Sequence, residues 1–119
     1  MTLIIYNEKG AKHANVTLVG GSELHWKTNR IFSKKGKQLN LREVSFVNSG
    51  KQTKRFHLPA SKNAVDDHCF SLVTAKYTLD FEASCKAERD ALVQGFTILM
   101  TRFREKMPVE EVNWGAKKV

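Results

Sequence analysis

The sequence has few cysteines and no long apolar run, and both absences narrow the class of protein. Only Cys69 and Cys85 occur in 119 residues, too few for the disulfide framework of a small secreted domain. No apolar run approaches the roughly 18 residues of a membrane-spanning helix. The apolar stretch at residues 2–6 is too short for the core of a signal peptide. These absences favour a single domain that folds in a reducing, cytoplasmic setting.

Motifs of catalysis and metal binding are also missing. The sequence contains no G-x-S-x-G elbow, no P-loop and no paired carboxylates. The four histidines do not have metal-ligand spacing, and the adjacent His68 and Cys69 do not form a ligand pair. Cys85 has no base close to it in sequence, which argues against a nucleophilic thiol. We therefore predict that the chain is not an enzyme and holds no metal and no cofactor.

Acidic residues are scarce between residues 27 and 65. That segment has ten lysines and arginines and one acid, Glu43, so its charge is +9, and the remainder of the chain carries about −1 of the total of +8. Such asymmetry points to an anionic partner, which leaves a membrane, an acidic protein or nucleic acid. The plainer alternative is that the basic loops only keep the chain solvated. Trp26, Phe32 and Phe56 lie among these cations and would suit stacked bases, or simply a protein core.

One long amphipathic helix is predicted over residues 84–107. Four large apolar residues recur there at spacings of four, three and four, which places them on one helical face: Leu92, Phe96, Leu99 and Phe103. Ser84 suits the N-cap, and Pro108 is expected to end the helix. A helix this apolar on one face needs a surface to cover, and we expect it to plug the open end of a small antiparallel barrel.

Short strands are predicted in the rest of the chain. Alternating or β-rich runs occupy residues 2–6, 15–19, 23–27, 38–47, 68–74 and 77–82. The alternation changes phase near Glu43, so the 38–47 run is split into two strands. Gly20-Gly21 predicts a hairpin, whereas residues 7–13, 28–37 and 48–67 are predicted to be loops. Seven strands followed by one helix indicate an α+β, mainly β fold rather than a parallel βαβ sheet.

Several of these segments resemble the pleckstrin homology (PH) family, especially the PH domains of phospholipases C. The last hairpin and helix (HCFSLVT, YTLDFEA, SCKAERDALVQGF), the middle strands (QLNLREVSFVNSG) and ELHWK follow the family order over residues 3–106. The resemblance implies a seven-stranded antiparallel, partly open barrel capped by one C-terminal helix. It also implies a domain over residues 1–107, a tail over residues 108–119, and Leu92 at a position where the family usually has tryptophan.

The same resemblance implies a phosphoinositide site near the first loop, in degenerate form. In this resemblance Ile4 and Tyr6 align with the inward-pointing basic pair of strand one in lipid-binding members, and Ala14 aligns with the arginine of strand two, so most of the stereospecific clamp is missing. Basic residues remain around the first loop and the 28–37 loop, and these are the candidate lipid-binding residues: Lys9, Lys12, His13, Arg30, Lys34, Lys35 and Lys37.

Two functions are compatible with this pattern, and the loss of basic residues at Ile4, Tyr6 and Ala14 favours the first. The first is a PH-fold adaptor that acts at a membrane surface through protein–protein contacts, as the similarity to apicomplexan inner-membrane-complex sub-compartment proteins implies. In that family an acylated N-terminal extension supplies membrane attachment, and we expect peripheral membrane association of this kind. The second function is direct binding of phosphoinositide or other anionic lipid. The resemblance does not favour nucleic acid as a partner.

Overall fold

Seven strands and one long helix make up the part of the chain that the computed structural model describes, residues 1–28 and 36–113, with side chains up to residue 105. The strands are β1 (Thr2–Asn7), β2 (Gly10–Val19), β3 (Glu23–Thr28), β4 (Lys37–Asn40), β5 (Val44–Ser49), β6 (Cys69–Thr74) and β7 (Thr78–Glu82). Helix α1 (Lys86–Asn113) follows the last strand. The predicted α+β, mainly β class is therefore confirmed.

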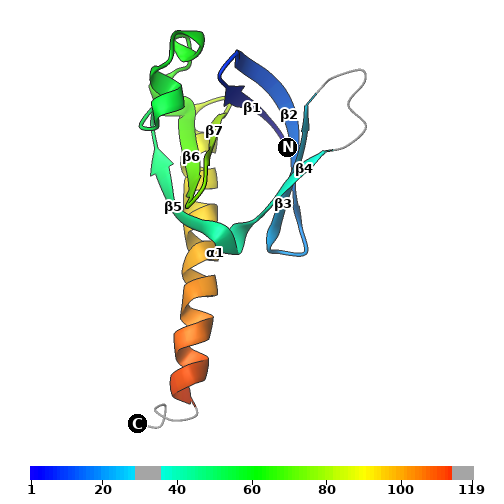
Figure 1. Ribbon diagram of the computed structural model, residues 1–119, viewed down its shortest axis with the longest axis vertical. Coiled ribbons are helices and arrows are strands. Elements are labelled where there is room, and N and C mark those ends of the chain that lie inside the picture. The colour runs from blue at the N-terminus through cyan, green and yellow to red at the C-terminus, as the bar shows by residue number, and fades with distance from the viewer. Residues whose placement is uncertain (29–35, 114–119) are drawn as a thin grey trace.

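The strands form one antiparallel sheet that curls but does not close. Their order across the sheet is β4-β3-β2-β1-β7-β6-β5, so β4 and β5 are its two edges (Figure 1). The chain passes between these edges through a short 3-10 turn, η1 (Leu41–Glu43), which the Asn40 side chain caps by accepting from the Arg42 N–H at 2.9 Å. This turn is the predicted break near Glu43. The expected seven-stranded, partly open architecture is confirmed.

The first hairpin is much tighter than the sequence suggested. Residues 7–13 were expected to form a loop, but only Glu8 and Lys9 separate β1 from β2. The Asn7 side chain accepts from the Lys9 N–H at 2.8 Å, and Gly10 adopts a φ of +127° that other residues rarely adopt. The start of β2 was missed because it is polar, and a strand with solvated side chains does not show a clear apolar alternation.

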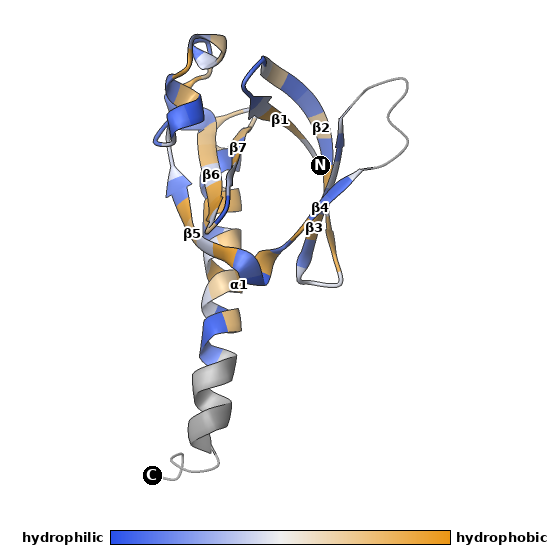
Figure 2. Cartoon of the chain, viewed as in Figure 1, coloured by the Kyte–Doolittle hydropathy of each residue, from blue (hydrophilic) through white to orange (hydrophobic). Residues whose placement is uncertain are grey.

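One face of the sheet carries the main apolar core, and α1 covers it. Phe70, Phe81 and Leu72 are fully buried on this face, and the rings of Phe70 and Phe81 stack with centroids 5.3 Å apart. Figure 2 shows apolar residues along the strands that line the interior. From the helix, Phe96 and Met100 are buried in this core, with 6% and 5% of their surface exposed.

The other members of the predicted helix stripe lie at the margin of the core. Leu92, Leu99 and Phe103 are half-buried and contact the core from outside it. Phe103 also lies under the Arg42 guanidinium, whose carbon is 4.6 Å from the ring centroid. The helix therefore covers the sheet as expected, but the deepest contacts come from Phe96 and Met100 rather than evenly from the four-residue stripe.

Both ends of α1 differ from the prediction. Ser84 does not accept a hydrogen bond from the first turn; its N–H and hydroxyl both donate to the Glu88 carboxylate, at 2.8 and 3.1 Å. The helix also continues through Pro108 to Asn113, so the expected end at Pro108 is wrong. Proline has a φ close to the helical value, so it removes one hydrogen bond without forbidding helical backbone. The division into a domain and a tail at residue 108 stays a prediction, and residues 114–119 lie outside the described part.

The opposite face of the sheet is covered by residues 50–68. This segment was expected to be a long polar connection, and it contains three short 3-10 helices, η2 (Lys54–His57), η3 (Pro59–Ser61) and η4 (Asp66–His68). Phe56 is inserted against Tyr6, with ring centroids 5.4 Å apart. A second, smaller core results, made of Tyr6, Phe56, Ala64 and Cys69.

Candidate functional site

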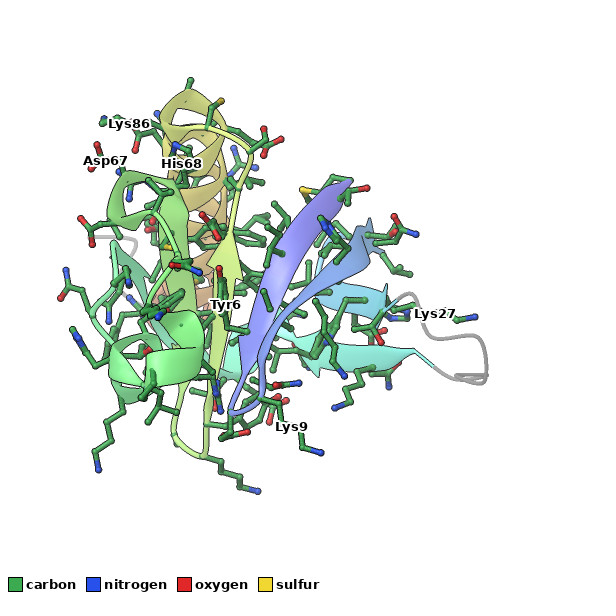
Figure 3. The ribbon with its side chains drawn as sticks, turned by 90° about the horizontal axis from the view of Figure 1, so that it is seen from above. Tyr6, Lys9, Lys27, Asp67, His68 and Lys86 are labelled. Carbon is green, nitrogen blue, oxygen red and sulfur yellow. The ribbon has the colours of Figure 1, made fainter. Side chains whose placement is uncertain are left out.

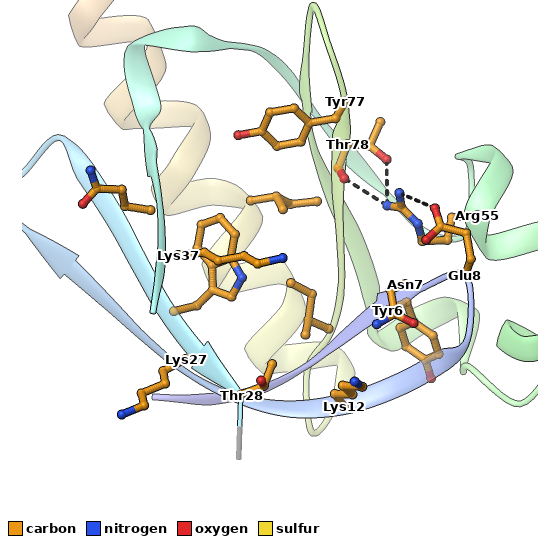
Figure 4. Close-up of a pocket in the computed structure, with 14 residues that line it drawn as sticks. Tyr6, Asn7, Glu8, Lys12, Lys27, Thr28, Lys37, Arg55, Tyr77 and Thr78 are labelled. Atoms are coloured by element: carbon orange, nitrogen blue, oxygen red, sulfur yellow. Dashed lines mark hydrogen bonds and ion pairs between the residues drawn. The ribbon is translucent and has the colours of Figure 1, made fainter. Parts of the chain in front are cut away.

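A cavity of about 740 Å³ opens at the end of the sheet where the β1–β2 turn, the end of β3 and the β6–β7 turn meet (Figure 4). Its wall includes Trp26 and Leu79, which belong to the main core. Among the described residues, its charged lining consists of four cations, Lys12, Lys27, Lys37 and Arg55, and one acid, Glu8. The cavity is thus apolar at its floor and basic at its mouth.

Strand geometry explains why the basic residues gather there. Lys12 lies on the same face of β2 as Ala14 and Val16, because side chains alternate along a strand, and those two residues are in the main core. Lys12 therefore continues the interior row where the core ends, opposite Ile5 of β1. Lys37, on β4, is paired with Trp26 of β3. Figure 4 shows Lys12 and Lys37 from different strands around one opening.

Arg55, in η2, belongs to a polar cluster that forms part of the cavity wall. Its Nη1 donates to the Asp80 carboxylate at 2.5 Å and to the Thr78 carbonyl at 3.0 Å, and its Nη2 donates to Glu8 at 3.1 Å. Burial disfavours the charged guanidinium, but the hydrogen bonds to Glu8 and Asp80 raise the pKa of Arg55 above its usual value. Arg55 is therefore cationic at any physiological pH.

Asp80 is fully buried, and hydrogen bonds surround its carboxylate. Besides Arg55, it accepts from the hydroxyls of Thr53 at 2.6 Å, Ser71 at 2.7 Å and Thr78 at 2.9 Å. A buried carboxylate with this many donors is held firmly in one position. The cluster therefore anchors Arg55 and, with it, one wall of the cavity.

The structure brings together only part of the predicted lipid-binding set. Lys12 and Lys37 line the cavity, and Lys9 is exposed at the tip of the β1–β2 turn (Figure 3). His13 is exposed and pairs with Ile4 on the opposite face of the hairpin, away from Lys12. Arg30, Lys34 and Lys35 lie outside the described residues.

Two of the positions aligned with the family's basic residues face the wrong way. Ile4 and Tyr6 were expected to point inward, but Tyr6 belongs to the second core on the other face of the sheet, and Ile4 packs against that core. The Tyr6 hydroxyl donates to Glu82 at 2.6 Å, and burial together with this hydrogen bond raises the pKa of Tyr6. Because side chains alternate along a strand, an alignment moved by one residue on β1 would exchange Ile4 and Tyr6 for the residues of the interior face. The interior positions near the mouth are Ile5 and Asn7, which line the cavity.

Sequence reasoning did not include Arg55, Lys27 or Glu8 among the candidate lipid-binding residues. Lys27 directly follows the aromatic residue of a predicted strand, so its place at the strand end was a usable signal. Arg55 lies in the long connection, where no periodicity predicts that a residue reaches the cavity. Glu8 was passed over because only cations were considered.

In the part of the chain that the structure describes, the side chains that could serve a catalytic or metal site are structural or dispersed. Cys69 is buried, and burial, helped by Glu82, raises the pKa of its thiol to about 12. Within residues 1–28 and 36–113, no three histidine, cysteine or acidic residues cluster so as to hold a metal ion. In the same part of the chain, no helix combines the length and the apolar character needed to cross a bilayer.

Comparison with known proteins gives matches in structure only. No family model matches the chain, and no curated protein matches its sequence. Among solved structures, inner membrane complex sub-compartment protein 1 (ISP1) of Toxoplasma gondii superposes with a TM-score of 0.68 at 11% identity, covering 85% of this chain and 82% of that one. The N-terminal PH domain of human ARAP2 gives a TM-score of 0.59 at 16% identity, covering 86% and 77%.

The predicted resemblance to the PH domains of phospholipases C is confirmed by a structural match. PLC21 of S. officinalis superposes with a TM-score of 0.64 at 13% identity, over 83% of this chain but only 15% of that one. The similarity therefore concerns one part of PLC21 and not the whole protein. Together with the open seven-stranded sheet and the C-terminal helix, these matches show that the chain has the pleckstrin homology fold.

Proposed function

We propose that this chain is a non-enzymatic module that binds a phosphate-bearing headgroup at a membrane surface. The observation that carries the proposal is that Lys12 and Lys37 lie around one cavity, with Lys27 at its rim and Glu8 as the only acid in its described lining. Several charge-assisted donors around one opening suit the oxygens of a phosphate group. A basic residue close to an anionic leaflet contributes on the order of 1 kcal/mol to membrane attraction.

The structural comparisons support a membrane location. ISP1 and ISP3 of Toxoplasma gondii, the latter with a TM-score of 0.62, are both named as inner membrane complex proteins. PH-fold neighbours as a group act in membrane or protein interactions, which agrees with the basic segment found in the sequence. Attachment through an acylated N-terminal segment remains a further prediction.

Binding of moderate strength and strong salt dependence is expected. Ile5 and Asn7 contribute no charge from β1, and Ala14 is buried in the core. The cavity therefore has cations on three of its strands but lacks a dense clamp. Attraction that comes mainly from exposed lysines is screened at physiological ionic strength, where the Debye length is about 8 Å.

A second candidate function is the adaptor role, in which a protein occupies an exposed face. The observation in its favour is Phe46, which is 51% exposed on the edge strand β5. A large apolar side chain on an edge strand suits a protein partner, because an edge strand presents unpaired backbone groups. Phe46 on β5 and Lys37 on β4 lie on opposite edge strands of the sheet, so this surface can be tested separately.

Co-sedimentation with phosphatidylcholine vesicles that contain phosphatidylserine or a phosphoinositide, at low and physiological salt, tests the first function. Lys12→Ala and Lys37→Ala should each weaken binding, whereas Lys86→Ala should not. Lys86 lies at the opposite end of the molecule (Figure 3), so this control removes the same charge elsewhere. Equal losses in all three variants would mean non-specific attraction and would favour the adaptor role, as would an absence of vesicle binding.

A further inference from the structure

The contact between Glu8 and Arg55 places an acid of the protein itself at the mouth of the basic cavity. Both residues line the cavity, and the Glu8 carboxylate accepts from Arg55 Nη2 at 3.1 Å (Figure 4). Glu8 lies in the two-residue β1–β2 turn, and Arg55 lies in the segment that covers the outer face. The pair therefore spans two elements that have no sequence proximity.

The two acids that contact Arg55 are held very differently. The side chain of Asp80 is completely buried and also accepts from three hydroxyls. The side chain of Glu8 is 72% exposed, and Arg55 is its ion-pair partner. An exposed ion pair contributes little to stability, whereas a buried, fully hydrogen-bonded one is costly to break. The Asp80 contact is therefore fixed, and the Glu8 contact is exchangeable.

We propose that Glu8 is an internal counter-anion on Arg55, and that a phosphate group of the ligand displaces it when it enters the cavity. This inference rests on the headgroup-binding function proposed above and assigns a role to two residues of that site. With Glu8 turned out to solvent, Arg55 Nη2 faces the cavity while Nη1 stays on Asp80. A guanidinium N–H can donate to a phosphate oxygen in place of a carboxylate oxygen without a change of geometry.

Displacement of Glu8 makes the site selective for charge. A ligand must compete with a carboxylate that is already in place, so a headgroup with phosphate monoesters, which carry about two charges each, gains more than a singly charged phosphodiester. Backbone hydrogen bonding and the Arg55 guanidinium lower the pKa of Glu8, so the competing acid is ionised at neutral pH. Glu8 thus lowers the affinity for weakly charged ligands and makes binding depend on the charge of the ligand.

A purely structural role for Glu8 predicts a different result. The β1–β2 turn is already fixed by the Asn7–Lys9 hydrogen bond and by the φ of Gly10. Removal of the Glu8 charge should therefore leave the melting temperature nearly unchanged. A large drop in the melting temperature of Glu8→Gln would overturn the assignment of Glu8 as an exchangeable counter-anion.

The decisive experiment compares Glu8→Gln with Asp67→Asn. Both substitutions remove one negative charge, but Asp67 is exposed at the opposite end of the molecule (Figure 3). Binding is measured on phosphatidylcholine vesicles that contain either phosphatidylserine or phosphatidylinositol bisphosphate. Glu8→Gln should bind about two- to fivefold tighter than wild type, which is the range expected for loss of one exposed ion pair. Asp67→Asn should bind as wild type does at physiological salt.

An Arg55→Lys background provides the second arm of the test. A lysine ammonium keeps the charge but lacks the planar fork that joins Asp80 to Glu8, so the gain from Glu8→Gln should disappear there. The ratio of the affinity for phosphatidylinositol bisphosphate vesicles to that for phosphatidylserine vesicles should also fall in Glu8→Gln, because binding to phosphatidylserine is strengthened relatively more. Competition by free inositol bisphosphate would show that the cavity binds the phosphate group itself, whereas binding that only vesicles support would show that a lipid surface is required.

The outcomes separate this inference from the proposed function. Vesicle binding by wild type with equal gains in Glu8→Gln and Asp67→Asn would overturn the Glu8 role and leave headgroup binding intact. No binding by wild type together with clear binding by Glu8→Gln would support the Glu8 role in its strongest form. No binding by either protein would remove the proposed function, and the inference with it.

Discussion

The two faces of the sheet are buried in different ways. Strand β7 shows this within five residues: Leu79 and Phe81 point into the apolar core under α1, whereas Asp80 and Glu82 point to the other face. Both acids are nevertheless buried, with 0% and 7% of their surface exposed. One face is sealed by apolar contact, and the other is sealed by a segment that supplies hydrogen bonds.

This difference concerns specificity as much as stability. Apolar contact is non-directional, so the α1 face tolerates changes that preserve volume. The outer face depends on particular partners, since Glu82 accepts from the Tyr6 hydroxyl and from the Val65 N–H at 3.0 Å. A buried polar network stabilises most when its members are satisfied, and among the described residues the buried Arg55 Nε and Ser61 Oγ have no hydrogen-bond partner. The same network fixes Arg55 at the cavity, so the outer face contributes to the site as well as to the fold.

The largest effect is expected from a cavity on the apolar face. Phe81→Ala removes a fully buried ring that stacks on Phe70, and should lower the free energy of unfolding by about 3–5 kcal/mol. Urea denaturation measures this change. Phe46→Ala serves as the control, because its exposed ring should change stability by no more than about 0.5 kcal/mol. Similar losses in both variants would contradict the assignment of the core face.

A slightly smaller loss is expected when the outer face loses its central acid. Asp80→Ala leaves Arg55 without its buried partner and three hydroxyls without their acceptor, at an expected cost of about 2–3 kcal/mol. The Asp80→Ala, Arg55→Ala double variant should lose less than the sum of the single variants. Additive losses in a denaturation cycle would show that the two residues are not coupled.

Substitutions in helix residues at the margin of the core should lower the free energy of unfolding less than substitutions on either face of the sheet. Leu92 occupies the position implied for the family tryptophan, but it is only half-buried. Leu92→Ala should therefore cost about 1–2 kcal/mol, below the range for a fully buried leucine. Met100→Ala, which removes a buried side chain, should cost more in the same denaturation assay. The reverse order would place the helix in a different rotation on the sheet.

The smallest effect should come from the ionisation of Tyr6 and Cys69, which changes stability only at alkaline pH. The pKa of Tyr6 and that of Cys69 are both raised in the fold, mainly by burial. The unfolded chain therefore ionises first, and the stability that the neutral groups confer is present below about pH 9 and is lost as pH rises. A Tyr6→Phe, Cys69→Ala variant should show a shallower fall in unfolding free energy between about pH 9 and 12. Parallel curves for the variant and wild type would contradict this linkage.

Local sequence patterns were sufficient for most of the fold. The phase change near Glu43, the Gly20-Gly21 turn and the apolar spacing around Phe96 predicted the strand break, the second hairpin and the helix that covers the core. Periodicity fails where the residues are polar, as at the start of β2. Proline was also a poor guide to the end of the helix, because α1 continues through Pro108 to Asn113.

The candidate site was less accessible to sequence reasoning. Lys12 and Lys37 were identified because they lie in the first loop and the 28–37 loop, where the family resemblance implies a lipid site. The inward orientation expected for Ile4 and Tyr6 was wrong, however, because both lie on the face of β1 that meets the second core. Glu8 and Arg55 are 47 residues apart in sequence, and nothing local to either residue indicates that they meet.

The strand and helix periods, the basic segment and the apolar helix face can all be predicted from the sequence, because each depends on neighbours within a few residues. Which segment covers each face of a strand depends on contacts between residues that are far apart in the chain. Residues 50–68 fold over Asp80 and Glu82 through long-range hydrogen bonds, and this turns two apparently solvated acids into buried ones. The cavity has the same origin, because its cations come from β2, β3, β4 and η2 and converge only when the sheet curls.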